Sequence, residues 1–154
     1  LALDLGRVSL DADAEKLRSI VDNLIGNAVK FTPAGGTISV AVRASGDEAV
    51  IDVIDSGPGV PAEESQSVFE SFFRGRTKAS GRVEGTGLGL AIAREYTEAH
   101  GGRISVIADK GAGGHFRVRL PRNGQRALAI DGGGDVVLAV GRDTPAELVA
   151  FALQ

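Results

Sequence analysis

The sequence lacks cysteine, methionine and tryptophan, and it has a small deficit of positive charge. Without cysteine it can form neither disulfides nor thiolate metal sites. No apolar run approaches the roughly 18 residues that a membrane-spanning helix needs, and no signal-peptide pattern is present, so we expect no membrane insertion by this segment. Its 17 Lys and Arg against 20 Asp and Glu give a net charge of −3, which argues against a nucleic acid as a partner.

The composition that remains is typical of a globular domain. Of 154 residues, 43% are hydrophobic and 24% are charged, and this length suffices for one domain with a proper core. The first residue is Leu1 and not methionine, so we expect the sequence to be part of a longer chain. Its 22 glycines exceed average usage and gather in short clusters.

The segment 17–33 carries the strongest periodic signal. Six apolar residues fall on one helical stripe, which predicts a helix packed on a core: Leu17, Ile20, Val21, Leu24, Ala28 and Phe31. Asn23 and Asn27 lie one turn apart beside this stripe, and Lys30 follows on the next turn. Two amide oxygens suit a hard cation such as Mg²⁺ when a polyphosphate brings the negative charge. An amphipathic helix with polar residues facing water explains the same spacing, and this segment alone leaves both interpretations open.

The remaining pattern predicts an α+β fold, a two-layer sandwich in which helices cover one face of a mixed, largely antiparallel sheet. The first helix has its N-cap at Asp13 and ends near Phe31, and the second runs from 85 to 99. A short helical start is expected at 61–64. The expected strands occupy 1–10, 37–44, 48–55, 103–108 and 115–120.

The residue pattern of the sequence changes after Arg122. We expect residues 1–121 to form one domain and 122–154 a C-terminal appendage to which no role is assigned. Within the appendage, 127–131 and 135–140 predict a hairpin, and the start at 143 predicts a helix through LVAFAL.

Two glycine-rich motifs suggest ligand contacts. Asp55 ends a strand and is followed by Gly57 and Gly59, so its carboxylate could accept a hydrogen bond from an exocyclic amine while the glycines let a planar base lie close to the backbone. The sequence GTGLG at 85–89 opens a helix with exposed N–H groups, which form a general anion site. Its spacing and context match neither the dinucleotide fingerprint nor the P-loop.

The order of these features resembles the catalytic ATP-binding domain of sensor histidine kinases, which has the Bergerat fold shared with DNA gyrase and mismatch-repair ATPases. The resemblance covers about residues 3–121. It rests on an N-x-x-x-N helix, a D-x-G-x-G turn, a phenylalanine cluster at 68–73, a polar basic loop at 74–84, a G-x-G-x-G helix start and a final glycine-rich strand entry at 111–114.

The resemblance implies ATP and Mg²⁺ as cofactors and assigns a role to each motif. Asn23 and Asn27 would hold Mg²⁺, Lys30 would reach a phosphate, and Asp55 would bind the adenine amine with Gly57 and Gly59 beside the base. Phe69, Phe72 and Phe73 would anchor a lid formed by 74–84, with Arg74 near the γ-phosphate. The phosphates would meet the segment made by Gly85, Thr86, Gly87, Leu88 and Gly89.

The residue type at position 23 distinguishes between the activities that the resemblance allows. Hydrolytic relatives carry glutamate at this position to activate water, and asparagine cannot accept a proton. We therefore expect transfer of the γ-phosphoryl group to a histidine on a dimerisation and phosphoacceptor domain absent from this sequence, with a response regulator downstream. The fragment alone is expected not to autophosphorylate, and its location is expected to be the cytoplasmic part of a membrane-anchored bacterial sensor. The alternatives are a non-catalytic nucleotide-sensing module and a hydrolytic ATPase of the same fold.

A few residues depart from the family pattern or have no role in it. Gly26 stands where many histidine kinases have an acid, and Gly114 replaces the usual Ser or Thr of the last glycine motif. His100 and His115, the only histidines, are expected to be structural. Glu48 and Asp52 are expected on the solvated face of a strand.

Overall fold

A computed structural model of the chain describes residues 2–5, 8–73, 86–107, 113–122, 134–140 and 148–153. Its helices are α1 (Ala14–Phe31) and α2 (Gly89–Ala99), with two short 3-10 turns, η1 (Ala62–Glu64) and η2 (Ser67–Phe69). Its strands are β1 (Ala2–Leu5), β2 (Ser9–Ala12), β3 (Ile38–Ser45), β4 (Glu48–Asp55), β5 (Arg103–Val106), β6 (His115–Pro121), β7 (Gly134–Val140) and β8 (Leu148–Leu153). In the part of the chain described here, no helix combines the length and the hydrophobicity that crossing a bilayer requires.

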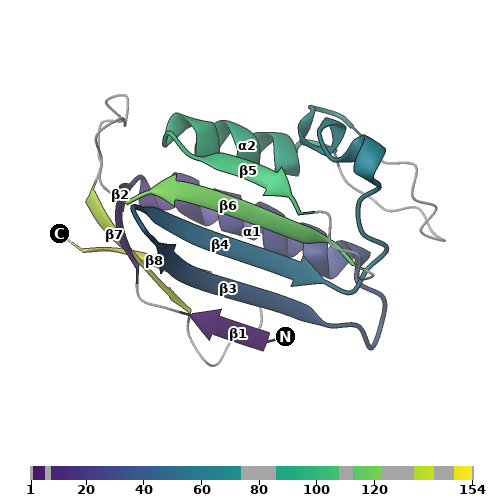
Figure 1. Cartoon of the computed structure of the whole chain (residues 1–154), viewed down its shortest axis with the longest axis horizontal. Coiled ribbons are helices and arrows are strands. Elements are labelled where there is room, and N and C mark those ends of the chain that lie inside the picture. Colours follow the sequence, from purple (N-terminus) through teal and green to yellow (C-terminus); the bar gives the residue numbers. More distant parts are fainter. Residues whose placement is uncertain are drawn as a thin grey trace.

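The main sheet has five strands in the order β1-β3-β4-β6-β5. The β1 strand runs parallel to β3 and all other neighbours are antiparallel. Both helices pack on one face of this sheet, and Figure 1 shows the other face uncovered by any helix. The predicted α+β sandwich with a mixed, largely antiparallel sheet is therefore confirmed.

The apolar stripe of α1 forms the centre of the core. Its members Leu17, Ile20, Val21, Leu24 and Ala28 are all at most 2% exposed. They pack against inward-facing sheet residues, among them Val40, Val53 and Val118. Burying one such side chain fully stabilises the fold by about 1.5–3 kcal/mol. The sixth predicted member, Phe31, is 38% exposed, because the helix ends there and the stripe passes beyond the sheet.

Capping residues set the ends of α1. The Asp13 side chain accepts a hydrogen bond from the N–H of Lys16 at 3.0 Å, which confirms the predicted N-cap. At the other end, the N–H of Thr32 bonds the carbonyl of Ala28, and the chain leaves in an extended conformation before Pro33. The second helix starts at Gly89 and not at residue 85, because Gly87 adopts φ +72°, which no right-handed helix accommodates.

A second sheet, in the order β2-β7-β8, was not foreseen in this form. The segment 1–10, predicted as one strand, instead supplies β1 to the main sheet, while β2 begins at Ser9 and pairs with β7. Alternation along the sequence predicts a strand, but it does not tell which sheet the strand joins.

The predicted C-terminal helix is wrong over Leu148–Leu153, which forms β8 antiparallel to β7. Valine and phenylalanine in this run favour a strand once a neighbour satisfies its backbone. The segment 127–131, the first half of the predicted hairpin, lies outside the described residues. The second half of the predicted hairpin, 135–140, lies in β7, and β7 pairs with β2 and β8.

Candidate functional site

Asp55 lies at the point where three segments of the chain meet. It is the last residue of β4, and only 6% of it is exposed. Its Oδ1 accepts hydrogen bonds from the N–H of Gly57 at 2.8 Å and from the N–H of Gly114 at 3.3 Å. Its own N–H donates to the carbonyl of Gly114 at 2.8 Å, which joins the end of β4 to the entry of β6. The carboxylate is therefore fixed in orientation by backbone groups on both sides.

The glycines around Asp55 are needed because backbones approach one another closely. A Cβ on Gly57 would lie 2.7 Å from the carbonyl oxygen of Phe31, at the end of α1. Gly59 has φ +72°, and a Cβ there would lie 2.6 Å from the carbonyl oxygen of Gly113. A Cβ on Gly114 would collide with Oδ2 of Asp55. Glycine at position 114, which departs from the family pattern, therefore leaves room for the Asp55 carboxylate.

Asn23 faces the start of α2. Its Nδ2 donates to the carbonyl of Ser19 at 2.8 Å, one turn earlier on α1. This bond directs Oδ1 away from the α1 backbone, so that a Cβ on Gly89 would lie only 2.7 Å from it. The first N–H groups of an α-helix have no partner within the helix and attract anions. An amide oxygen and a helix N-terminus therefore lie side by side.

Asn27 and Lys30 continue along the same helix. Asn27 is half-buried, and Lys30 is exposed in the last turn, with its Nζ 5.2 Å from the ring centroid of Phe31. Among the described residues, no group of three or more His, Cys, Asp or Glu gathers as a metal site. A divalent cation here would have to rely on amide oxygens, such as that of Asn23, and on ligand phosphates. That donor set suits Mg²⁺, which keeps few protein ligands.

The three residues of the phenylalanine cluster differ in burial, and Phe73 is intermediate between the other two. Phe69 is buried and meets Phe116 edge to face, with ring centroids 6.3 Å apart. Phe72 is 72% exposed and has φ 64°, an unusual conformation for a bulky residue. Its N–H bonds the carbonyl of Gly87 at 2.9 Å, and a Cβ on Gly87 would be 3.0 Å from its backbone. The cluster thereby holds the segment that leads into α2.

The described part of the phosphate motif begins at Thr86. The Thr86 Oγ1 accepts a hydrogen bond from the N–H of Leu88 at 3.4 Å, and Gly89 opens the helix. Two predicted site residues, Arg74 and Gly85, lie outside the described residues, as does the remainder of the predicted lid.

His100 makes a contact between the helices that sequence reasoning did not specify. Its Nε2 accepts a hydrogen bond from the N–H of Asp13 at 3.0 Å, and its Nδ1 is 2.6 Å from the carbonyl of Tyr96. Because Nε2 accepts, Nδ1 carries the proton and donates to that carbonyl. His100 is 5% exposed and joins the C-terminus of α2 to the N-terminus of α1, which is the structural role expected of it.

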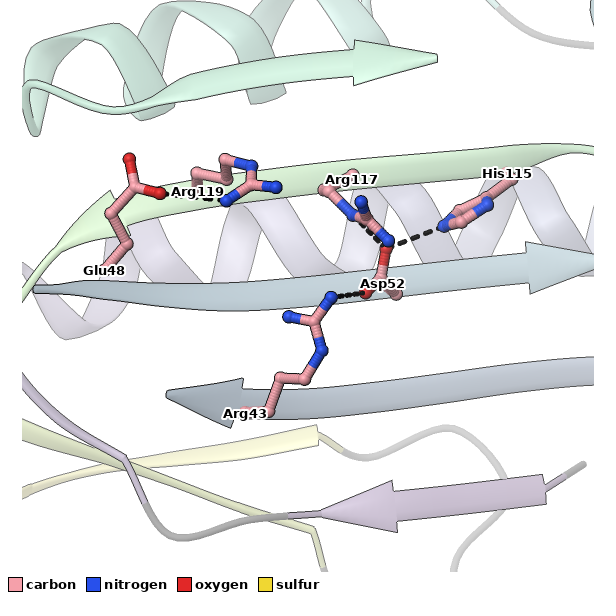
Figure 2. A network of polar contacts seen from close by, with 6 residues as sticks. All are labelled: Arg43, Glu48, Asp52, His115, Arg117 and Arg119. Atoms are coloured by element: carbon pink, nitrogen blue, oxygen red, sulfur yellow. Dashed lines mark hydrogen bonds and ion pairs between the residues drawn. The ribbon is translucent and has the colours of Figure 1, made fainter. Parts of the chain in front are cut away.

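The expectation that Asp52 lies on a solvated face is wrong. Asp52 is 5% exposed, and its Oδ1 accepts hydrogen bonds from Arg117 Nε and His115 Nε2, both at 2.7 Å. Burial by itself would raise the pKa of Asp52, but the hydrogen bonds and charges of Arg117 and His115 outweigh it and hold the pKa below its ordinary value. Figure 2 shows this network on the face of the sheet opposite the helices. Among the described residues, Nδ1 of His115 is buried without a hydrogen-bond partner.

Comparison with known sequences gives matches over most of the chain. The pattern of a family described as "Histidine kinase-, DNA gyrase B-, and HSP90-like ATPase" matches residues 12–124. The circadian input-output histidine kinase CikA of Synechococcus elongatus is 41% identical over 110 residues, which cover 71% of this chain and 15% of that protein. The sensor histidine kinase RcsC of Escherichia coli is 42% identical over 117 residues, covering 76% of this chain and 12% of that protein. The chain thus spans only a small part of these relatives.

Solved structures give the same picture. A mycobacterial sensor histidine kinase, MprB, superposes with a TM-score of 0.72 at 30% identity, covering 80% of this chain and 84% of that one. The nucleotide-free catalytic domain of the histidine kinase ThkA superposes with a TM-score of 0.69 at 28% identity, covering 80% of this chain and 79% of that one. The similarity therefore extends from sequence pattern to three-dimensional arrangement.

Proposed function

Because the chain belongs to the histidine kinase-, DNA gyrase B- and HSP90-like ATPase family and is a catalytic domain of the sensor histidine kinase kind, we propose that it binds Mg·ATP and transfers the γ-phosphoryl group to a histidine of a separate phosphoacceptor domain. The observation that carries this proposal is the position of the Asn23 amide oxygen against the N-terminus of α2. A cation held by Asn23 would then lie next to a helix end suited to phosphates.

The base end of the proposed site is Asp55. Since its Oδ1 already accepts two backbone N–H groups, we assign its Oδ2 to the exocyclic amine of adenine. Gly57 and Gly59 would border the base, where side chains are excluded by the neighbouring backbone. A buried acceptor of fixed orientation favours a ligand with an amine at this point over one with a carbonyl, because two acceptors would face each other.

The phosphate end combines α1 with the start of α2. Asn23 and Asn27 would hold Mg²⁺, which supplies charge neutralisation when bound. Lys30 and Arg74 would contact phosphate oxygens, and the backbone N–H groups of 85–89 would donate hydrogen bonds to the remaining phosphate oxygens.

Asn23 also explains why transfer is proposed over hydrolysis. An amide cannot take a proton from water, whereas a neutral imidazole attacks phosphorus without losing a proton first. Asn23 and the start of α2 would hold the triphosphate for a nucleophile carried by a partner domain.

The partners follow from the same proposal. The phosphoacceptor histidine would belong to a dimerisation domain of the same kinase, and a response regulator would take the phosphoryl group onward. We propose residues 1–121 as the catalytic unit, located in the cytoplasm as part of a membrane-anchored sensor, with 122–154 as an appendage.

Calorimetric titration with a non-hydrolysable ATP analogue tests the site. Binding should require Mg²⁺ and should weaken by about tenfold or more in Asp55→Asn, whose amide presents a donor to the amine in one of its two orientations. Binding that is indifferent to both changes would overturn the assignment.

Addition of the cognate histidine domain and γ-labelled ATP tests the activity. Phosphohistidine on the added domain, and none on the fragment alone, is expected. Nucleotide binding without transfer would instead support a non-catalytic nucleotide-sensing module. Steady phosphate release by the fragment alone would indicate a hydrolytic ATPase.

A further inference from the structure

The uncovered face of the main sheet carries a row of arginines. Cross-strand register places Arg43 opposite Val50, Val50 opposite Arg119, and Arg119 opposite Arg103. One position along, Arg117 lies opposite Asp52. All four arginines therefore project from the face that the helices leave open, and Figure 2 shows three of them beside Asp52 and Glu48.

The two most exposed charged side chains of the ion-pair network on this face are guanidinium groups. The Asp52 side chain is 7% exposed and contacts Arg43 and Arg117, at 3.4 and 2.7 Å. Glu48 is 30% exposed at its side chain and contacts Arg103 and Arg119, at 3.1 and 2.9 Å. The side chains of Arg43 and Arg103 are 46% and 67% exposed. Arg117 and Arg119 are 22% and 28% exposed, no more than Glu48, so Arg43 and Arg103 are the charges of this network that an approaching molecule meets first.

Stability of the sheet does not account for the placement of Arg103 beside Arg119. Arg119 and Arg103 stand directly opposite each other, and like charges in that position are unfavourable. Exposed ion pairs contribute little, about 0–1 kcal/mol each. With Asp4 exposed on the edge strand β1, the described residues of this face include four arginines and three carboxylates, on a chain whose net charge is −3. The face therefore has a small excess of positive charge although the molecule as a whole is acidic.

An exposed apolar side chain lies on the same face. Ile54 alternates with Asp52 on β4, pairs with His115 across to β6, and is 41% exposed. Val50 is fully buried between the stems of the neighbouring arginines. A surface that joins guanidinium groups to an apolar contact suits an acidic protein segment, because such a segment can supply both carboxylates and an apolar side chain.

We propose that this face, defined by Arg43, Ile54, Arg103, Arg117 and Arg119, is a docking surface for an acidic protein segment. Carboxylates of the segment pair with the two most exposed arginines, Arg43 and Arg103, and an apolar side chain packs on Ile54. The surface lies on the side of the sheet away from Asn23 and α2, so docking leaves the proposed nucleotide site accessible.

Selection of peptides on the intact 154-residue chain tests this surface. A library of random short peptides is selected on the wild type and depleted on Arg43→Gln/Arg103→Gln, which keeps Arg117 and His115 on Asp52 and Arg119 on Glu48. Enriched sequences should contain several Asp or Glu around one apolar residue. Enrichment of sequences without acids, or no enrichment over the depleted pool, would overturn the proposal.

Fluorescence anisotropy with one enriched peptide then gives the size of the effect. Affinity should fall about tenfold in the double variant, equivalent to about 1.4 kcal/mol, and should fall with salt. The matched control Arg18→Gln/Arg94→Gln removes the same charge from the helices, where both side chains are comparably exposed, and should leave affinity within about twofold.

Two further measurements distinguish specific peptide binding at this face from nonspecific electrostatic attraction. Ile54→Ser should weaken peptide binding without changing its salt dependence. A single-stranded oligonucleotide should bind no better than a neutral peptide. Equal loss in the double variant and in the control, or tight oligonucleotide binding, would contradict an acidic protein segment as the occupant.

Discussion

A Cβ at position 89 should act on Asn23, and the size of the effect can be worked out from the contacts. In Gly89→Ala the new Cβ would lie 2.7 Å from Asn23 Oδ1, so the amide must turn away. Turning it breaks the 2.8 Å bond from Nδ2 to the carbonyl of Ser19, a loss of about 0.5–1.5 kcal/mol. Alanine in a helix instead of glycine gains up to about 1 kcal/mol. The single change should therefore leave stability nearly unaltered.

The same substitution should behave differently once Asn23 is shortened. In an Asn23→Ala background no oxygen meets the new Cβ, so Gly89→Ala should stabilise by up to about 1 kcal/mol. The double-mutant cycle should give a coupling free energy of about 1 kcal/mol between the two positions. Because the chain has no tryptophan, urea unfolding is best followed by far-ultraviolet circular dichroism. Mg²⁺-dependent binding of the ATP analogue should fall in Gly89→Ala about as much as in Asn23→Ala.

Additivity would refute this reasoning. If the two substitutions add to within about 0.3 kcal/mol, the Asn23 oxygen does not lie against the start of α2. If they couple in stability while nucleotide binding by Gly89→Ala stays normal, the contact is present but Asn23 is not a ligand of the metal.

His100→Phe should cost about 2 kcal/mol, because two hydrogen bonds of about 1 kcal/mol each are lost and the Asp13 N–H is left unpaired; a thermal melt should shift downward by roughly 4–8 °C, and an unshifted melt would contradict a stabilising role of His100 between the two helices. Asp52→Asn should lower the free energy of unfolding at neutral pH. Since the folded pKa of Asp52 is lowered, the stabilising contribution of its carboxylate is present above about pH 4 and is lost as the pH falls below that value. The free energies of unfolding of wild type and variant, measured by urea unfolding at a series of pH values, should therefore converge in acid. Gly114→Thr, which restores the usual family residue, should weaken binding of the ATP analogue by about tenfold or more because its Cβ displaces Asp55 Oδ2; unchanged or tighter binding would show that the carboxylate adapts.

The sequence carried enough information to predict the main sheet and α1. A helical apolar stripe and alternating strands bury their apolar faces when the helix packs on one face of the sheet, and Asp13 and Thr32 mark the helix ends by local chemistry. Where local preference and pairing compete, prediction was poorer. Residues 148–153 suit a helix or a strand equally, and their neighbour β7 decides between them.

The candidate site was predicted from motifs, and its internal contacts were not. Spacing indicated Asp55 and the glycines around it, but the fit between Gly114 and Asp55 Oδ2 joins residues far apart in the sequence. The burial of Asp52 was missed for a similar reason. Alternation placed it on the outer face, and only the register across β4 and β6 brings Arg117 and His115 over it.

Pairing of β2 with β7 has a practical consequence for anyone shortening this chain. Leu10 and Ala12 of β2 are buried in the core, and within the described part of the chain β7 is the only strand that pairs with β2. A truncation after Pro121 removes that neighbour and leaves the N–H and C=O groups of β2 as an open edge directly before the first helix, where another molecule can add a strand. Such a fragment should self-associate as its concentration rises, although it retains every residue of the proposed nucleotide site.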